Sequence, residues 1–360
     1  MIVVVSTCIL AVVLTYLSKY KNFHWGFEVG FIIVTIVACL HYNYGNDYMR
    51  YYFHWQDYAQ YSFSEIFNSE DRQEPGWILL NWLFGFKYGF FVLVIVLSIF
   101  QNFVFYKLIK DFSPLNWRWL GFFIYLFSNT FYILNFSMLR QALSISIIVL
   151  SFSYIYKNKL LPSICLIIAA SFIHTSALVF LPAVFIGKIK KNYISFFALI
   201  FLLLTAIFYL VDTTSLSLIN SVLSMDSFES YDRYTGYSGN RLGMGVILMI
   251  VPYLIIIYFL ISRKKELDSN GTKLAIVCST AILFIPFTVY VSLIARAGWY
   301  YSIFQIATVP LIYSKIKMKL FQVAIIFILL FINLYNYFNM LNDPVWFESY
   351  HEFHTIFEAI

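Results

Sequence analysis

The chain has 360 residues, of which 61% are hydrophobic and only 12% are charged, and its mean hydropathy is +0.77. This composition excludes a soluble globular domain, because apolar stretches of about 17–25 residues recur along the whole length, as transmembrane helices require. The net charge of +6 does not indicate nucleic-acid binding, because the basic residues flank the apolar stretches, where the positive-inside bias explains them.

We predict an all-α polytopic membrane protein with about ten full spans. The spans are expected at residues 1–17, 27–41, 88–106, 119–134, 139–156, 192–211, 243–262, 274–294, 298–314 and 320–338. The N-terminal stretch lacks a basic region and a small-residue cleavage site, so we expect a retained first span rather than a cleaved signal. The whole chain, 1–360, is expected to form a single integral membrane domain.

Residues 159–187 are ambiguous, because this stretch is too long for one ordinary span and short for two. A single crossing would place every later basic cluster outside, whereas a turn back near His174 keeps those clusters inside, as the positive-inside bias requires. We therefore predict a broken, re-entrant helix pair with its break at His174. Non-helical backbone at membrane depth persists only where it is buried in protein or lines a wet cavity.

Nearly all lysines that flank the predicted spans lie at one set of ends, and most arginines lie at the other. The lysines at one set of ends are Lys19, Lys21, Lys107, Lys110, Lys157, Lys159, Lys188, Lys190, Lys191, Lys264, Lys265, Lys273, Lys315, Lys317 and Lys319. The arginines at the other ends are Arg50, Arg72, Arg140, Arg233, Arg241 and Arg296. Lysine on the cytoplasmic side is an ordinary topology signal. Arginine outside opposes that bias and indicates a second role, since its planar guanidinium pairs with phosphate and carboxylate groups.

With this topology both termini lie outside, and the external segments are loops 42–87 and 212–242 and the tail 339–360. No P-loop, G-x-G-x-x-G, H-E-x-x-H or G-x-S-x-G motif is present. The acids of loop 212–242 lack a dense ligand pattern, so we expect no metal and no cofactor. All four cysteines lie inside apolar runs, so we expect no disulfide.

The outer ends carry the candidate substrate-binding residues. Arg140 and Gln141 open the span 139–156, and Arg296 lies between two late spans, followed by Tyr300. We expect these side chains to bind a phosphorylated glycan. The alternatives are an interfacial Arg140 whose stem snorkels and an Arg296 that caps a helical hairpin. The same group includes Arg50 and Tyr51 in the first outer loop and Arg241 at the end of the second loop.

The candidate catalytic residues are His174 and Asp47. A neutral His in a polar break of an apolar stretch can act as a general base near pH 7, although a His hydrogen-bonded within a packed bundle is the alternative. Asp47 precedes Arg50 and Tyr51 in the first outer loop, where it competes with His174 as the base. The alternative for these three loop residues is a solvated loop.

Several of these residues stand in motifs that resemble the EpsG-like polysaccharide polymerases. The motifs are Arg140-Gln141-Ala142, a basic turn at Lys157 and Lys159, Ala170-Ser171-Phe172-Ile173-His174-Thr175-Ser176-Ala177-Leu178, Gly45-x-Asp47-Tyr48-x-x-Tyr51 and Glu74-Pro75-Gly76-Trp77. Arg296 is similar to the family's Arg between late spans. The resemblance covers most of the chain, and the block 140–178 is its most specific part.

The resemblance implies a GT-C-like, Wzy-type membrane glycosyltransferase. Such an enzyme joins oligosaccharide repeat units carried on undecaprenyl pyrophosphate at the outer face of the bacterial inner membrane, for O-antigen, capsule or exopolysaccharide. Its partners would be lipid-linked glycan donor and acceptor, the bilayer and a chain-length regulator protein, without nucleic acid. The alternatives are an O-antigen ligase, a flippase or transporter of the lipid-linked glycan, and a membrane acyltransferase. A transporter predicts a repeat and paired broken helices, and the sequence shows neither.

Overall fold

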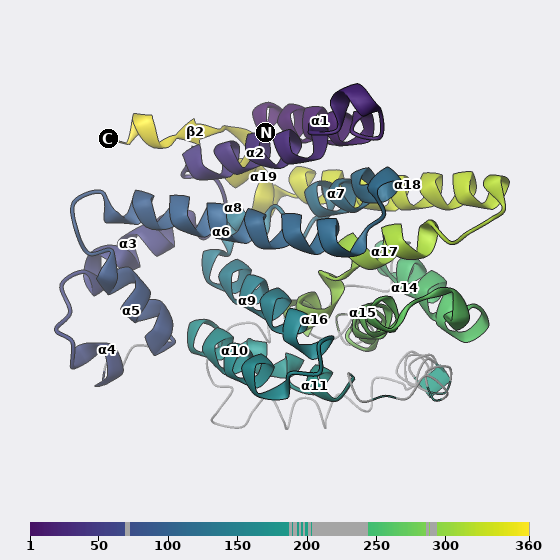
Figure 1. The fold of residues 1–360 in the computed structure, drawn as a ribbon. Coiled ribbons are helices and arrows are strands. Elements are labelled where there is room, and N and C mark those ends of the chain that lie inside the picture. Colours follow the sequence, from purple (N-terminus) through teal and green to yellow (C-terminus); the bar gives the residue numbers. More distant parts are fainter. Residues whose placement is uncertain are drawn as a thin grey trace.

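The structure is a computed structural model that describes residues 1–68, 73–186, 244–285 and 294–359, together with positions 189, 193, 196, 199, 200, 203 and 288. Figure 1 shows a bundle built almost entirely of helices. The helices before residue 187 are α1 (Ile2–Leu17), α2 (Gly26–Leu40), α3 (Tyr48–Tyr58), α4 (Glu65–Asn68), α5 (Pro75–Leu83), α6 (Gly89–Phe112), α7 (Arg118–Phe127), α8 (Leu134–Ser137), α9 (Leu139–Ile155), α10 (Leu160–Ile173) and α11 (Ala183–Ile186). The later helices are α14 (Met244–Ser262), α15 (Ser269–Thr280), α16 (Ile294–Ser302), α17 (Gln305–Tyr313), α18 (Lys319–Asn342) and α19 (Pro344–His351).

Short 3-10 turns and one strand pair complete the described fold. The turns are η1 (Lys21–Phe23), η2 (Leu115–Trp117), η3 (Thr175–Phe180), η7 (Lys264–Glu266), η8 (Ala281–Leu283) and η10 (Ile356–Glu358). Strand β1 (His41–Tyr42) pairs antiparallel with β2 (His354–Thr355), with His41 opposite Thr355. The strand pair therefore joins the segment after α2 to the C-terminal tail.

Three of the described helices are long and apolar enough to cross a membrane alone, namely Lys21–Leu40, Gly89–Phe112 and Lys319–Asn342. They lie roughly parallel to one another and to α1 (Figure 1). The outward faces carry large apolar side chains, such as Phe327 (68% exposed) and Phe331 (60% exposed) on α18. Exposed side chains of this kind suit contact with lipid rather than water, so the protein is membrane-embedded.

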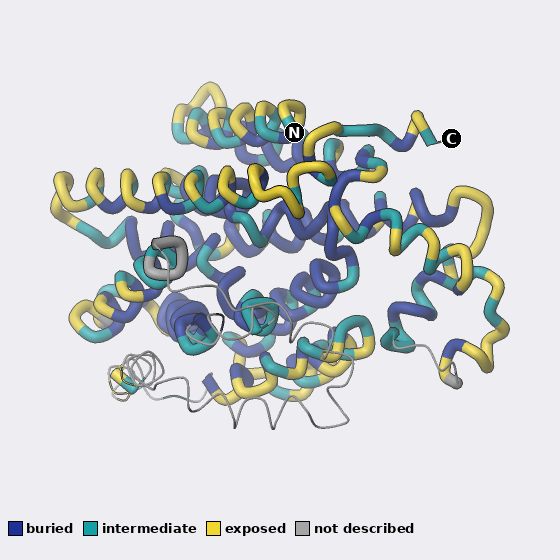
Figure 2. Tube along the Cα trace, turned by 180° about the vertical axis from the view of Figure 1, so that it is seen from behind, coloured by how far each residue is buried: buried dark blue, intermediate teal, exposed yellow. Residues whose placement is uncertain are grey.

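The centre of the bundle is formed by α7 and α9, whose residues are mostly buried. Figure 2 shows the contrast between this buried interior and the exposed outer helices. α9 packs against α6 and α10, and α7 packs against α1 and α17. A largely apolar helix such as α7 is expected at a central position, and the buried serines of α9 include Ser146 and Ser151, whose hydroxyls bond to backbone carbonyls of their own helix.

Several predicted full spans are divided into shorter helices, so the described part of the chain does not show ten continuous spans. The predicted span 119–134 ends as α7 at Phe127, where the Ser128 and Thr130 hydroxyls bond to each other (2.9 Å) and Ser128 Oγ accepts from the Thr130 N–H. Such side chains compete with the helical hydrogen bonds. The span 298–314 is divided between α16 and α17, and most of 192–211 lies outside the described residues.

The break predicted at His174 is present. α10 ends at Ile173, His174 adopts an extended conformation (φ −155°, ψ 110°), and η3 begins at Thr175. Both η3 and α11 return into contact with α10. The chain therefore turns back at this position, and its polar residues face the end of the bundle where α9 begins.

The two ends of the bundle differ in their basic residues. At one end, here called the Lys end, Lys110 closes α6, Lys157 follows α9, and Lys315 follows α17. At the opposite end, called the Arg end, Arg140 opens α9 and Arg50 lies in α3. Both chain termini also lie at the Arg end (Figure 1).

Candidate active site

Gly45 brings the loop after α2 onto the segment that precedes α9. Its φ of +116° lies in the left-handed region that favours glycine, and a Cβ atom here would lie 2.7 Å from the Phe136 carbonyl oxygen. Its N–H donates to the Ser349 carbonyl oxygen (3.0 Å). The Asp47 N–H donates to the Ser137 hydroxyl (3.4 Å). The loop is thus held between the C-terminal tail and α8, with Asp47 directly before α3.

One face of α3 points into a cavity at the Arg end. Arg50, Tyr51 and His54 line this cavity, as their spacing of three and four residues along a helix allows. The Tyr51 ring packs edge-on against Trp77 of α5, with centroids 5.4 Å apart. This contact fixes α3 against α5.

Gly76 allows α5 to approach the end of α10. A Cβ atom at this position would lie 2.6 Å from the Phe172 carbonyl oxygen. Pro75 starts α5, where its missing N–H costs nothing, and Glu74 occupies the capping position before it. Because Phe172 lies two residues before His174, this close approach brings Glu74 to the break after α10.

The Glu74 carboxylate joins three elements. Its Oε2 accepts from Arg140 Nη1 (2.5 Å), and its Oε1 accepts from the Thr175 N–H (2.8 Å) and hydroxyl (3.2 Å). The same Oε1 lies 3.2 Å from His174 Nδ1. A carboxylate can only accept, so Nδ1 carries the proton and Nε2 remains an acceptor. Glu74, Arg140 and His174 have only 15–19% of their side chains exposed.

The contacts of Glu74 keep it ionised. Burial raises the pKa of Glu74, but the hydrogen bond from His174, the charge of Arg140 and the N–H of Thr175 outweigh burial and hold that pKa at about 2. The ordinary value for a Glu is 4.5. Glu74 is therefore a fixed anion at neutral pH, and it orients a cation and an imidazole.

The first turn of α9 also holds the start of α16. Gln141 Nε2 donates to the Arg296 carbonyl oxygen (3.1 Å), and Arg140 donates to the Gln73 side-chain oxygen. Among the described residues, neither Arg50 nor Arg296 forms an ion pair with a carboxylate. Both guanidinium groups are therefore available to an anionic ligand within this part of the structure.

These elements enclose a cavity of about 150 Å³, here called the Arg cavity. It is lined by Asp47, Arg50, Tyr51, His54, Gln73, Met138, Arg140, Gln141, His174 and Arg296. Three permanent cations face one carboxylate on this lining, and Glu74 stands behind it. The excess of guanidinium groups suits an anion such as a phosphate.

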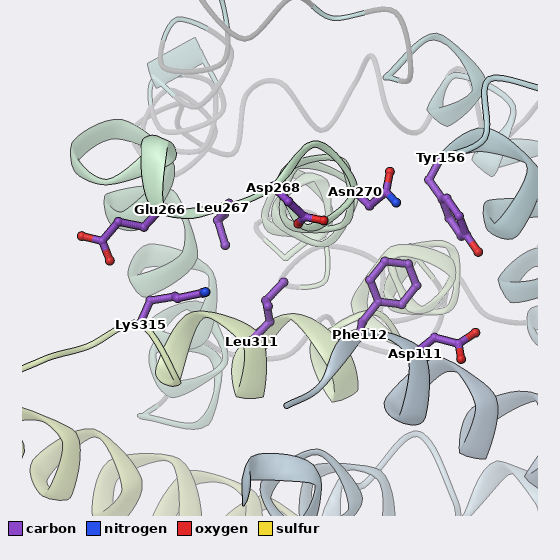
Figure 3. A pocket seen from close by; sticks show the side chains of 9 residues that line it. All are labelled: Asp111, Phe112, Tyr156, Glu266, Leu267, Asp268, Asn270, Leu311 and Lys315. Atoms are coloured by element: carbon purple, nitrogen blue, oxygen red, sulfur yellow. The ribbon is translucent and has the colours of Figure 1, made fainter. Parts of the chain in front are cut away.

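A second polar cavity, of about 390 Å³, lies at the Lys end and is here called the Lys cavity (Figure 3). It is lined by Asp111, Phe112, Tyr156, Glu266, Leu267, Asp268, Asn270, Leu311 and Lys315. Its three carboxylates outnumber its one lysine, so the lining does not suit an anion. No group of three or more His, Cys, Asp or Glu in the described residues is arranged to hold a metal ion.

The comparison with known families agrees with the motifs found in the sequence. The sequence model described as the EpsG family matches residues 24–351, which include every residue of the Arg cavity. The chain belongs to the EpsG family. No curated protein matched the chain, and no solved structure matched it.

Most residues singled out in the sequence of this EpsG family member meet at the Arg cavity. They are Asp47, Arg50, Tyr51, Arg140, Gln141, His174 and Arg296. Tyr300 differs from the expectation that it contacts the glycan. Its side chain is fully buried, and its hydroxyl bonds to Ser176 (3.0 Å) and Ser144 (3.3 Å). Arg241 lies outside the described residues.

Glu74 is the residue of the EpsG site that the sequence analysis quoted but did not assign to the site. Its partners lie 66 and 100 positions away in the chain, so spacing alone does not reveal them. The useful signal was chemical. Arg140 is a permanent cation at the start of an apolar stretch, and such a charge requires a counter-charge when it is shielded from water. Glu74, directly before a helix-starting Pro75, was an acid with a fixed position in the outer loop.

Proposed function

We propose that this EpsG family member is a Wzy-type polymerase. It transfers a glycan from undecaprenyl pyrophosphate to a hydroxyl of a second lipid-linked repeat unit, at the outer face of the bacterial inner membrane. The observation that carries the proposal is the convergence of Arg50, Arg140 and Arg296 on one cavity beside His174. The positive-inside bias supports the orientation, because the Lys end then faces the cytoplasm.

The arginines serve the leaving group. As the bond between the anomeric carbon and the phosphate oxygen breaks, negative charge develops on the pyrophosphate. Preorganised guanidinium groups stabilise this charge without reorganising water. Arg50 and Arg296 have no carboxylate partner among the described residues, whereas Arg140 is oriented by Glu74.

His174 serves the acceptor. Its Nδ1 is bound to Glu74, so Nε2 can take the proton from the attacking hydroxyl. A carboxylate behind an imidazole fixes its tautomer and stabilises the protonated ring. The new glycosidic bond forms as the pyrophosphate leaves, and the proton passes to His174. Asp47, on the same lining, is the rival base.

The surface glycan of a strain that lacks this gene tests the proposal. Loss of a polymerase leaves single repeat units on the carrier or core, and the wild-type gene restores the long chains. Unattached polymer would instead indicate a ligase, and repeat units that remain facing the cytoplasm would indicate a flippase. A chain-length regulator protein as partner would appear as a changed length distribution when the two proteins are separated.

A further inference from the structure

A third cavity, of about 260 Å³, lies between α14, α16, α17, α18 and the segment that follows α7. Its described lining comprises Ser128, Asn129, Thr130, Phe131, Met249, Pro252, Tyr253, Ala281, Phe284, Ile285, Thr288, Ala295, Gly298, Trp299, Ser302, Gln305, Ile332, Asn333 and Asn336. We call it the neutral cavity, because none of these residues is Asp, Glu, Lys, Arg or His. Hydroxyl and amide side chains are nevertheless abundant in it.

The lining has the chemistry that an uncharged sugar requires. Amides and hydroxyls both donate and accept hydrogen bonds, and aromatic side chains such as Trp299 and Phe131 provide flat apolar surfaces. A lipid chain would bind more favourably in an apolar groove, such as the groove between α2 and α6 that is lined by Ile32, Ile36 and Phe103. A charged ligand would lack a counter-charge on the described lining of the neutral cavity.

Helix α16 is shared by the Arg cavity and the neutral cavity. Arg296 lines the Arg cavity, whereas its neighbour Ala295 and, further along the helix, Trp299 line the neutral cavity. Arg296 and Trp299 are three residues apart, so they are separated by about 5 Å along the helix axis. Gln141 anchors the start of this helix to α9. If the phosphate of a ligand binds Arg296, the groups attached to that phosphate therefore lie beside α16.

We infer that the neutral cavity binds uncharged sugar residues of the lipid-linked glycan whose pyrophosphate lies in the Arg cavity. This inference rests on the proposed polymerase function and narrows its substrate class to repeat units with neutral sugars next to the phosphate. α16 contributes side chains to both parts of this site. The arginines hold the charged leaving group, and the amides of α18 with Trp299 hold the sugar.

The test uses the purified full-length protein and a phosphate-free probe. The probe is the oligosaccharide released by mild acid from the lipid fraction of a strain that lacks this gene. We expect Asn333→Leu with Asn336→Leu to raise the Kd of this oligosaccharide by about tenfold or more, because hydrogen-bonding groups are lost from the lining. Asn339→Leu on the same helix, exposed and outside the cavity lining, is the matched control and leaves the Kd unchanged.

Arg140→Ala separates this inference from the proposed function. The probe carries no phosphate, so this variant binds it with wild-type affinity while polymerisation is lost. An undetectable affinity in the wild type, or an equal Kd for the double variant and Asn339→Leu, would overturn the inference and leave the polymerase proposal intact. If the double variant does not accumulate in membranes, Trp299→Leu tests the same cavity from α16, with the same expected and contrary results. Long chains in the gene-deletion strain would instead refute the polymerase proposal.

Discussion

The two polar ends of this bundle contain opposite kinds of charge site. The Arg cavity holds three arginines in a space of about 150 Å³, whereas the Lys cavity holds three carboxylates and one lysine in about 390 Å³. Helix α9 connects them, with Arg140 at its start and Tyr156 directly after its end. Its 17 residues span about 25 Å, close to the thickness of a bilayer core.

The difference in solvent exposure between the two ends distinguishes charged side chains that only reflect membrane topology from those that form a binding site. At the Lys end, the Lys110 and Glu28 side chains are 44% and 37% exposed and lie 3.3 Å apart, which is typical of a weak surface pair. At the Arg end, the side chains of Arg140 and His174 both contact the carboxylate of Glu74, and all three are largely shielded from solvent. The exposed Lys110 is solvated by water, whereas the shielded Arg140 depends on a protein partner.

The largest expected effect is all-or-none labelling that distinguishes the two ends. In a variant without the four native cysteines, a membrane-impermeant thiol reagent added outside should label Gln56→Cys and should not label Lys317→Cys. Lys190→Cys tests the turn back at His174 and should also be protected, while a cysteine at position 230 should be labelled. Labelling of position 190 from outside would refute the re-entrant arrangement.

Substitution of the two possible bases should have the next largest effect. General base catalysis typically contributes about 100- to 10,000-fold, so we expect His174→Gln to reduce the polymerisation rate by that order. Gln keeps hydrogen bonding but cannot titrate. The initial rate of chain extension in membranes provides the measurement.

The rival base is examined by Asp47→Asn under the same conditions. If His174→Gln polymerises normally and Asp47→Asn does not, Asp47 is the base and His174 only shapes the break. If both variants retain wild-type rates, base catalysis by either residue is excluded, and departure of the pyrophosphate must carry most of the rate.

Removal of the arginines compares the two ends directly. Arg140→Ala and Arg296→Ala should each reduce the rate about 100- to 1,000-fold, the order seen when one transition-state donor is lost. Arg140→Lys should also fail, because Lys lacks the planar fork. Lys315→Ala at the Lys end is the control and should retain long chains. Normal chain lengths in both Arg→Ala variants would rule out the pyrophosphate role, provided that all variants insert equally.

Neutralising one carboxylate at each end compares their contributions to stability. Glu74→Gln should cost about 3 kcal/mol or more, since removal of one partner leaves buried charge uncompensated. Glu28→Gln, in the exposed pair with Lys110, should cost about 0–1 kcal/mol. Thermal unfolding in detergent gives both values. Equal losses would mean that the shielding of Glu74 has no energetic consequence.

The smallest expected effect is a change with pH. A carboxylate whose pKa is lowered by folding stabilises the folded state fully above its ordinary pKa of 4.5, and this stabilisation is lost as pH falls toward about 2. The stability difference between wild type and Glu74→Gln should therefore be constant from pH 7 to 5 and shrink toward pH 3. Apparent melting temperatures across this range provide the measurement. A constant difference down to pH 3 would contradict the role of ionised Glu74.

The amino-acid sequence predicts the bounds of the long outer helices and of the central helix α9 well, and those of α7, α16 and α17 poorly. Apolar runs located α1, α2, α6 and α18, although α6 continues to Phe112 beyond the predicted end at residue 106. Its last turns carry Lys107 and Lys110, which lower hydropathy without ending the helix, because long side chains reach water. The predicted span 119–134 was wrong, because the hydroxyls of Ser128 and Thr130 form bonds that single-residue hydropathy does not register.

The sequence predicts a site residue where a charged or polar side chain stands at a position that ordinarily disfavours it. Arg140 opposes the positive-inside bias, and His174 interrupts an apolar stretch. Tyr300 lies one helical turn beyond Arg296 on the same face of α16, but it is buried and does not line the Arg cavity, and spacing along the chain does not reveal burial. The position of Glu74 depends on the close approach of Gly76 to Phe172, which is a property of the packed structure.

The pairing of β1 with β2 has a consequence for the order in which the protein is made. Asp47 is placed by a loop that bonds to Ser349, next to a strand that pairs with His354 and Thr355, and the Met1 amino group donates to the His351 carbonyl oxygen. The N-terminal segments, which are synthesised first, therefore form these contacts only after the C-terminal residues have been synthesised. During synthesis, a half-inserted chain contains Arg140 and His174 but lacks the residues that bond to Gly45 and pair with β1 beside Asp47. We therefore expect a chain released before residue 355 to lack the contacts that hold the loop before Asp47.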